Sequence, residues 1–270
     1  MTISEKADVL LRLHSGAGPL VLLNAWDAAS ARVVEAEGYP AVATSSSGCA
    51  GVLGYADGEN IPPAEMLFLV SKIAGAVQVP VTADVEAGYG DPGKTAREVI
   101  AAGAVGLNLE DMVRGEMVPV TEQVSRIREV RAAADALGVH LVINARCDVF
   151  LEQVGAAAGR FDETVARLNA YRDAGADSLF APGVRDSATI GALVKAVRGP
   201  LNILATPGCP SIGEMAKLGV ARISFGGGPA RVALGAQRRL VRTVRDTGSF
   251  EALGVEAIPS GEMQVLLRRG

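Results

Sequence analysis

The sequence predicts a closed parallel barrel of eight β/α units, a TIM barrel, built by one chain of 270 residues. Two observations lead to this fold class. Eight short apolar runs alternate with helix-like stretches, and four of those stretches end at a glycine just before the next run. Parallel strands need crossover helices, and eight such units in a chain of this length favour a closed barrel over the alternative, an open doubly wound sheet.

The candidate strands are short, apolar and rich in β-branched residues, which is typical of a sheet covered on both faces. In chain order they are Leu20–Leu23, Ala41–Thr44, Val79–Ala83, Val105–Leu109, Leu141–Ala145, Ser178–Ala181, Leu201–Leu204 and Arg222–Phe225. None of these runs is long enough to cross a bilayer. The positive mean hydropathy of +0.27 is therefore attributed to a buried sheet and not to a membrane span.

The segments between the strands are expected to form the outer ring of helices. Residues 121–137 and 162–174, for example, keep apolar side chains at helical spacing with charged residues opposite them. Gly38, Gly103, Gly175 and Gly219 each follow such a segment and precede a strand. Glycine at this position commonly caps the carboxyl end of a helix, so these four residues mark repeated βα modules.

Composition points to one domain that binds a small molecule. No linker or change of composition interrupts residues 1–270, so a single barrel is expected, with a helical tail at about 245–270 for oligomer contacts. The net charge of -4 and the aromatic content of 4% exclude a basic or stacking surface for nucleic acid. An export signal and a disulfide framework are not evident, so a cytoplasmic protein is predicted, with Cys49, Cys147 and Cys209 as buried thiols.

Chemistry in such a barrel is expected at the carboxyl ends of the strands, which are polar here. They read Asn24–Asp27, Thr44–Gly48, Asp84–Glu86, Asn108–Asp111, Asn144–Arg146 and Ser224. The side chains of Asp84 and Glu86 leave the same side of their strand because they lie two residues apart, and Glu110 ends the neighbouring strand. Three converging carboxylates favour a divalent cation with oxygen ligands, namely Mg2+, with Mn2+ as an alternative.

A purely structural interpretation of these acids stays open. In it Asp84 caps a helix, Glu86 is solvated and Glu110 pairs with Arg146. In the functional interpretation Arg146, Glu110 and Asp57 are candidate catalytic residues, and the fork of donors on Arg146 suits a carboxylate or phosphonate. The candidate substrate ligands are Ser45, Ser46, Ser47, Asp84, Arg146 and Asn202.

The loops and the histidines complete the set of candidates. The glycine-rich segments 51–58, around Asp57, and 88–93 are candidate lids. The glycine run 226–228 resembles a phosphate cradle, but no Lys follows it, which favours a tight turn. His14 and His140 stand away from the strand ends and are assigned no role.

These motifs resemble those of the isocitrate lyase and phosphoenolpyruvate mutase superfamily over most of the chain. The segment around Asp84-Val-Glu86-Ala-Gly88-Tyr-Gly90 resembles its D-A-D-T-G-Y-G metal segment, Leu-Glu110-Asp111 resembles its L-E-D, and Ala-Arg146 resembles its A-R. Asn24–Asp27 together with Thr44–Gly48 is most similar to the methylisocitrate-lyase-like or phosphonomutase-like subgroup.

The resemblance implies a barrel whose eighth helix is exchanged between subunits of a homodimer, commonly within a homotetramer, and the tail 248–270 suits that exchange. It implies Mg2+ held by Asp84 and, partly through water, by Glu86 and Glu110. It also implies that backbone N–H groups around Ser45–Ser47 receive the carboxylate of a 2-oxo acid. Arg146 would contact the reacting end of the substrate.

The segment after Asp111 departs from the family. It reads Met-Val-Arg-Gly-Glu-Met-Val at 112–118, where the lyases carry K-K-C-G-H or K-R-C-G-H with a proton-donating Cys, and where the mutases carry K-T-N-S in a longer gating loop. Arg114 and Glu116 are the polar residues in its place. Neither of the two well-known activities is therefore expected to transfer directly.

We hypothesise cleavage of a C–C bond beside the carbonyl of a small 2-oxo acid, as in oxaloacetate decarboxylation or a retro-aldol step that releases pyruvate. Tyr89, Glu116 or water could protonate the enolate. P–C bond chemistry on phosphonopyruvate and a catalytically idle 2-oxo acid binding protein are the alternatives. A Schiff-base aldolase would need a Lys at a strand end, whereas Lys72, Lys94, Lys195 and Lys217 lie in helical or loop stretches.

Overall fold

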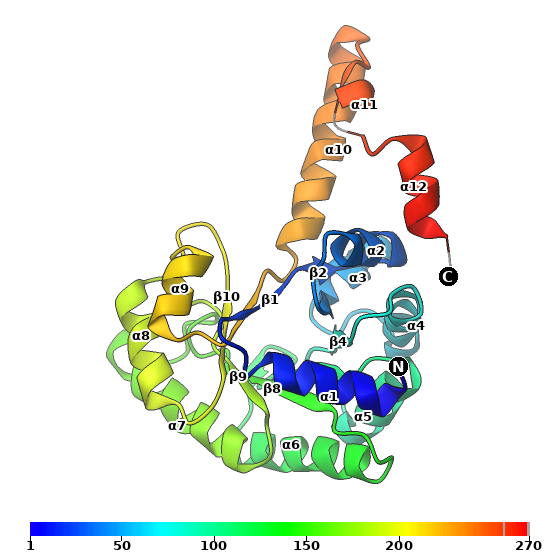
Figure 1. Ribbon diagram of the computed structural model, residues 1–270. Helices are drawn as coiled ribbons and strands as arrows, with labels where there is room; N and C mark the ends of the chain where they lie inside the picture. Colours follow the sequence, from blue (N-terminus) through cyan, green and yellow to red (C-terminus); the bar gives the residue numbers. More distant parts are fainter. Residues whose placement is uncertain (256, 269–270) are drawn as a thin grey trace.

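The computed structural model, which describes residues 1–255 and 257–268, contains a parallel sheet that closes on itself (Figure 1). Its strands are β1 (Leu20–Leu22), β2 (Asn24–Ala25), β3 (Val42–Thr44), β4 (Val81–Asp84), β5 (Gly106–Glu110), β8 (Val142–Arg146), β9 (Ser178–Phe180), β10 (Leu201–Leu204) and β11 (Arg222–Ser224). A separate antiparallel hairpin consists of β6 (Met112–Val113) and β7 (Glu116–Met117).

The ring closes through the first strand. β1 pairs with β11, and β2, which follows after Leu23, pairs with β3. The nine assigned strands therefore occupy the eight positions of a barrel, in the order β1-β11-β10-β9-β8-β5-β4-β3-β2. All eight predicted strands are confirmed, and so is the (β/α)8 fold class.

Helices surround the barrel as the sequence predicts (Figure 1). The described helices, including those that do not lie on the barrel wall, are α1 (Ile3–Leu13), α2 (Ala28–Ala36), α3 (Ser46–Val52), α4 (Pro63–Ala74), α5 (Pro92–Ala101), α6 (Val120–Asp135), α7 (Arg160–Asp173), α8 (Ser187–Ala196), α9 (Ile212–Leu218), α10 (Gly228–Thr247), α11 (Ala252–Val255) and α12 (Ser260–Leu267), with a short 3-10 helix at Ala157–Gly159. The segments 121–137 and 162–174 correspond to α6 and α7. No described helix is long and apolar enough to cross a membrane.

The four glycines that punctuate the sequence do end their helices. Gly38, Gly103, Gly175 and Gly219 have φ of 83°, 93°, 112° and 89°, in the left-handed region that disfavours any residue with a Cβ. Each lets the chain reverse from the end of a helix into the next strand within a few residues.

Helix α1 closes the amino end of the barrel. Leu10 is fully buried, and a Cβ placed on Gly106, the first residue of β5, would lie 2.8 Å from its Cδ2. Glycine at 106 therefore lets α1 approach the barrel floor closely.

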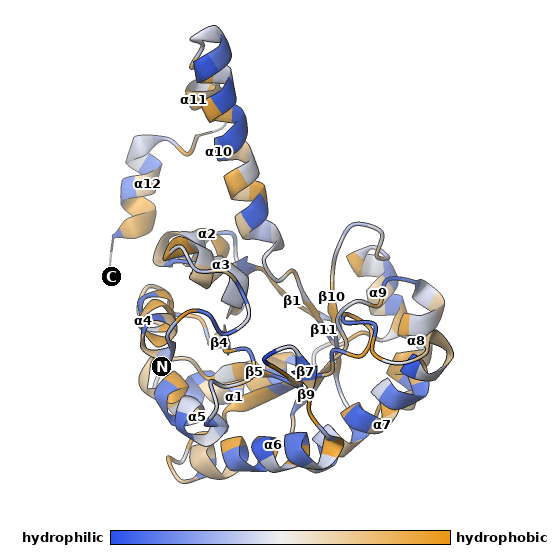
Figure 2. Cartoon of the chain, turned by 180° about the vertical axis from the view of Figure 1, so that it is seen from behind, coloured by the Kyte–Doolittle hydropathy of each residue, from blue (hydrophilic) through white to orange (hydrophobic). Residues whose placement is uncertain are grey.

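The carboxyl-terminal helices leave the barrel. Helix α10 extends away from it, with apolar and polar side chains interspersed along its length (Figures 1 and 2). Val232, Leu234 and Val241 on α10 are 74%, 61% and 59% exposed. α12 folds back onto α2, where the Arg32 guanidinium donates to the carbonyl oxygens of Leu266 at 2.6 Å and Arg268 at 2.9 Å.

Some expectations about the chain remain predictions or need correction. The single-domain organisation and the role of 245–270 in oligomer contacts are untested, and residues 256, 269 and 270 of that tail lie outside the described residues. Cys49 and Cys147 are buried as predicted, whereas Cys209 is only half-buried because it lies in the loop after β10.

Candidate active site

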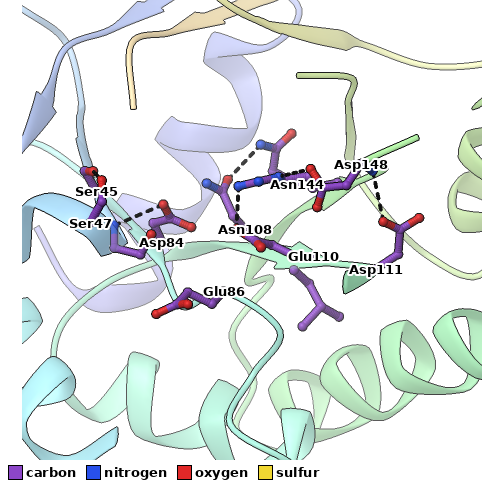
Figure 3. Close-up of polar contacts among 12 residues, drawn as sticks. Ser45, Ser47, Asp84, Glu86, Asn108, Glu110, Asp111, Asn144 and Asp148 are labelled. Carbon is purple, nitrogen blue, oxygen red and sulfur yellow. Dashed lines mark hydrogen bonds and ion pairs between the residues drawn. The ribbon is translucent and has the colours of Figure 1, made fainter. Parts of the chain in front are cut away.

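Strand register brings the predicted polar residues together at the carboxyl end of the barrel (Figure 3). Asp84 on β4 lies opposite Asn108 on β5, and Glu110 at the end of β5 lies opposite Arg146 at the end of β8. The Asn144 amide donates to Asn108 Oδ1 at 2.7 Å. Three neighbouring strands, β4, β5 and β8, thus supply two carboxylates, one guanidinium and a pair of hydrogen-bonded amides.

Asp84 is the residue best suited to bind a cation. Its side chain is 6% exposed, and its Oδ2 accepts the Ser46 N–H at 3.1 Å. Its Oδ1 is buried and has no hydrogen-bond partner among the described residues. Since a buried carboxylate oxygen without a partner is costly, this atom fits a site that receives a positive ion. The structural interpretation of Asp84 as a helix cap holds in part, because Asp84 accepts the N–H of Ser46, the first residue of α3.

The Glu86 side chain is buried and hydrogen-bonded, so the structural interpretation, in which Glu86 is solvated, is wrong for this residue. It is 4% exposed, accepts the Glu59 N–H, and receives the Tyr89 hydroxyl at 3.3 Å. Burial, followed by repulsion from Asp57, Asp84 and Glu59 and opposed by the Glu59 N–H, raises the pKa of Glu86 to about 7. Its backbone φ is 51°, a conformation that costs energy in a residue with a side chain.

Glu110 forms an ion pair with Arg146, whose Nε also donates to Asp148 Oδ1 at 2.7 Å. Burial raises the pKa of Glu110 well above its usual range, while Arg146 opposes this shift. Arg146 also lies over the Phe180 ring, 5.7 Å from its centroid. Glu110 and Asp148 therefore hold two edges of the guanidinium, and the Phe180 ring covers one face.

The three predicted metal ligands do not form a complete ligand set by themselves. Among the described residues, no group of three His, Cys, Asp or Glu side chains is arranged to hold a metal ion. Glu86 and Glu110 are engaged by Glu59 and Arg146, whereas Asp84 Oδ1 is buried without a partner among the described residues. Direct binding of one ion by all three acids stays a prediction, and Mg2+ commonly takes few carboxylates and completes its shell with water.

The serine segment lies beside Asp84 at the start of α3. Ser45 Oγ accepts the Gly48 N–H at 3.3 Å and lies 3.1 Å from Ser47 Oγ. The Ser45 N–H donates to the Ala25 carbonyl at 3.1 Å, and the Ser46 N–H donates to Asp84. The Ser47 N–H is therefore the amide of Ser45–Ser47 without a described partner and the one best placed for a substrate carboxylate. The glycine run at 226–228 packs here, where a Cβ on Gly227 would collide with Ser47 Oγ. That run is a close-packed turn, as predicted.

Asp57 and Asn202 occupy different environments. Asp57 lines a cavity of about 590 Å³ together with Trp26, Ser47 and Arg231. Although much of Asp57 is exposed, partial burial and then the charge of Asp84 raise the pKa of its carboxyl. Asn202 is fully buried and donates to Ser224 Oγ at 3.3 Å, so the geometry gives no support to its prediction as a substrate ligand.

The segment after Asp111 forms a regular antiparallel hairpin. β6 and β7 form a hairpin whose turn residues, Arg114 and Gly115, have φ of 51° and 82°. Two successive left-handed residues are typical of the tight turn that joins two antiparallel strands. Glu116 is exposed on this hairpin, and neither Arg114 nor Glu116 has a described contact with the acids of the site.

Residues that the sequence analysis missed support this site. Asp148 holds Arg146 and could have been found by the same two-residue spacing that singled out Asp84 and Glu86. Glu59 donates its N–H to Glu86 and accepts the Tyr89 N–H at 2.7 Å. Its backbone φ of 56° gives no signal in the sequence, since left-handed positions are rarely occupied by Glu.

Replacing Glu86 with Gln should stabilise the metal-free protein at pH 8 and have little effect near pH 5. The folded-state pKa of Glu86 is about 7, above its ordinary value. The charged form therefore destabilises the folded state above pH 7, and this cost disappears as the pH falls toward the unfolded-state pKa. Thermal unfolding in EDTA should show a Tm about 2–4 °C higher for E86Q at pH 8. The exposed E116Q serves as control, and equal Tm values for E86Q and wild type at pH 8 would contradict the assignment.

Comparison with known proteins places this geometry in a family. A model of the phosphoenolpyruvate phosphomutase family matches residues 10–245. An uncharacterized protein of Mycobacterium tuberculosis is 30% identical over 256 residues, or 94% of each chain. An oxaloacetate decarboxylase of Rhodopseudomonas palustris is 28% identical over 269 residues, covering 94% of this chain and 90% of the relative.

Solved structures agree with this grouping. A candidate lyase/mutase from Burkholderia cenocepacia superimposes with a TM-score of 0.90 at 36% identity, covering 97% of this chain and 96% of the other. A candidate phosphonomutase from the same organism gives 0.84 at 43% identity, with 88% and 99% covered. Oxaloacetate acetylhydrolase in complex with its product oxalate gives 0.85 at 26% identity, with 98% and 94% covered. Since the family model spans most of the barrel, this chain belongs to the phosphoenolpyruvate phosphomutase family, within the isocitrate lyase and PEP mutase superfamily.

Proposed function

We propose that this protein is a Mg2+-dependent lyase that cleaves a C–C bond beside the carbonyl of a small 2-oxo acid. The observation that carries the proposal is the buried, unpartnered Asp84 Oδ1 together with the fixed guanidinium of Arg146, which lies two strands away in the sheet. One group fits a cation and the other an anionic substrate, and both lie at the carboxyl end of the same barrel. Oxaloacetate is the first candidate substrate.

Asp84 would hold the Mg2+ ion directly, and Glu86 and Glu110 would contribute partly through water, with Mn2+ as an alternative. When bound, the ion would supply positive charge to the carbonyl oxygen on which negative charge develops as the C–C bond breaks. The raised pKa values of Glu86 and Glu110 fit a crowded acidic site that a cation would relieve.

The side chains and amides of the chain would orient the substrate. Amides of the Ser45–Ser47 turn would receive the carboxylate of the 2-oxo acid, and Arg146 would bind its departing end through the N–H groups that Glu110 and Asp148 leave available. Asp57 stays the third candidate catalytic residue. Orientation of this kind lowers the barrier because the reacting bond is held in one geometry.

Protonation of the product enolate is better served by Tyr89 than by Glu116. The Tyr89 hydroxyl is half-buried and donates to Glu86, whereas Glu116 is exposed on the hairpin. Burial and the neighbouring carboxylates raise the pKa of Tyr89, so its hydroxyl carries a proton at neutral pH. Water entering from the open end is the other source.

The relatives support this reaction class. The oxaloacetate decarboxylase of Rhodopseudomonas palustris matches nearly the whole chain, and the acetylhydrolase structure holds its product oxalate. A second candidate, P–C bond chemistry on a phosphonate, is favoured by the 43% identity to the candidate phosphonomutase. A catalytically idle 2-oxo acid binding barrel is the outcome to be excluded.

We also propose that the protein is a cytoplasmic homodimer or homotetramer in which α10 is exchanged between subunits. The support is the exposure of Val232, Leu234 and Val241 on a helix that leaves its own barrel (Figure 1). Such apolar surface is typical of a subunit interface.

Purified protein should release pyruvate from oxaloacetate in Mg2+ and not in EDTA. D84A should lose activity by at least about a hundredfold, since it removes the proposed direct ligand. The assay should include methylisocitrate, isocitrate, four-carbon hydroxy-oxo acids and phosphonopyruvate. Faster turnover of phosphonopyruvate would favour the P–C alternative, and saturable oxalate binding without turnover of any substrate would favour the idle barrel.

Light scattering after gel filtration should give the mass of a dimer or tetramer for wild type. Val241→Asp should shift the protein toward the monomer, because it buries a charge in the proposed interface. Leu137→Asp, which changes an exposed residue on the barrel wall after α6, is the matched control. A wild-type monomer would overturn the proposed assembly.

A further inference from the structure

A chain of buried polar contacts connects Arg146 to helix α7 outside the barrel. Arg146 Nε donates to Asp148 Oδ1 at 2.7 Å, and the Asp148 N–H donates to Asp111 Oδ1 at 2.9 Å. The Tyr171 hydroxyl donates to Asp111 Oδ2 at 2.8 Å, and Arg167 Nη1 approaches the same oxygen at 3.4 Å. Asp111 and Asp148 are labelled at this contact in Figure 3.

The members of this chain are shielded from water. Asp111, Asp148 and Tyr171 are fully buried, and Arg167 is 8% exposed. Water therefore cannot replace a lost contact without entering the protein. Both carboxylate oxygens of Asp111 are engaged, one by α7 and the other by the backbone of Asp148.

The same helix also fixes the hairpin beside the site. Arg167 Nη1 donates to the Val118 carbonyl at 2.9 Å, and the Val118 N–H donates to the Asp111 carbonyl at 2.9 Å. Arg167 Nε is held by Glu163 at 2.7 Å. Helix α7 thus supports both segments that follow β5 and β8.

We propose that Tyr171 and Arg167 are positioning residues for substrate recognition, acting on Arg146 through Asp111 and Asp148. The inference rests on the proposed function, in which Arg146 binds the anionic substrate. Arg146 is planar, and its Nε and Nη1 are bonded to Asp148 and Glu110, so the position of Asp148 sets the direction in which the remaining N–H groups point. A small displacement of Asp148 would turn that fork away from the substrate.

A double-mutant cycle with oxalate as the probe tests this inference. Oxalate affinity is measured by calorimetry in Mg2+ for wild type, Y171F, R146K and Y171F/R146K. Y171F should weaken oxalate binding about tenfold, as loss of a supporting contact around a ligand site typically does. In the R146K background, Tyr171→Phe should change oxalate affinity by less than about twofold, because the guanidinium through which Tyr171 would act is absent.

Three further measurements keep the test decisive. Tyr39→Phe removes a hydroxyl at the amino end of the barrel and should leave oxalate affinity unchanged. Mg2+ affinity without oxalate should change much less than oxalate affinity in Y171F, since Asp84, the proposed direct ligand, has no described hydrogen bond to this chain. R167K replaces Y171F in the cycle if Y171F does not fold.

The outcomes separate the two levels of the proposal. An equal loss of affinity from Y171F in both backgrounds, or no loss in either, would overturn the positioning role while leaving the proposed function intact. Absence of oxalate binding by folded, Mg2+-loaded wild type would overturn the proposed function, and the inference with it.

Discussion

Parallel pairing of neighbouring strands is the constraint on which the rest of this site depends. It places the carboxyl ends of β4, β5 and β8 in adjacent positions, with Asp84 opposite Asn108 and Glu110 opposite Arg146. Acids that are far apart in the sequence are thereby crowded into a region with little water. Crowding raises the free energy of their charged forms unless donors or cations compensate it.

The chain compensates most of this charge with its own groups. The Ser46 N–H serves Asp84, the Glu59 N–H serves Glu86, and Arg146 serves Glu110. Glu59, Glu86 and Tyr89, which join the two loops over the site, all have left-handed backbones. Strain of this kind persists when surrounding contacts enforce it, and it is common at functional sites. Asp84 Oδ1 is left without a partner among the described residues, as is Asp148 Oδ2, whose other oxygen accepts from Arg146.

The sequence predicts the strands and helices of the barrel well because local sequence patterns encode them. Apolar runs mark the strands, and glycines such as Gly175 mark the helix ends, each within a few residues. The neighbourhood of Asp84, Glu110 and Arg146 follows from strand order alone. Contacts between distant segments leave no such signal: Tyr171 and Asp111 are 60 positions apart. The Glu59 N–H, the hairpin at Arg114 and the direction of α10 likewise depend on tertiary packing.

The central claim is that this acidic site is completed by a divalent cation at Asp84. The most direct test is the Tm of wild type and D84N in Mg2+ and in EDTA at pH 8, above the pKa of about 7 of Glu86. Because an ion that binds only the folded state stabilises it, Mg2+ should raise the Tm of wild type by several degrees and leave that of D84N unchanged. A wild-type Tm that is the same in Mg2+ and in EDTA, at ion concentrations up to about 10 mM, would contradict the account.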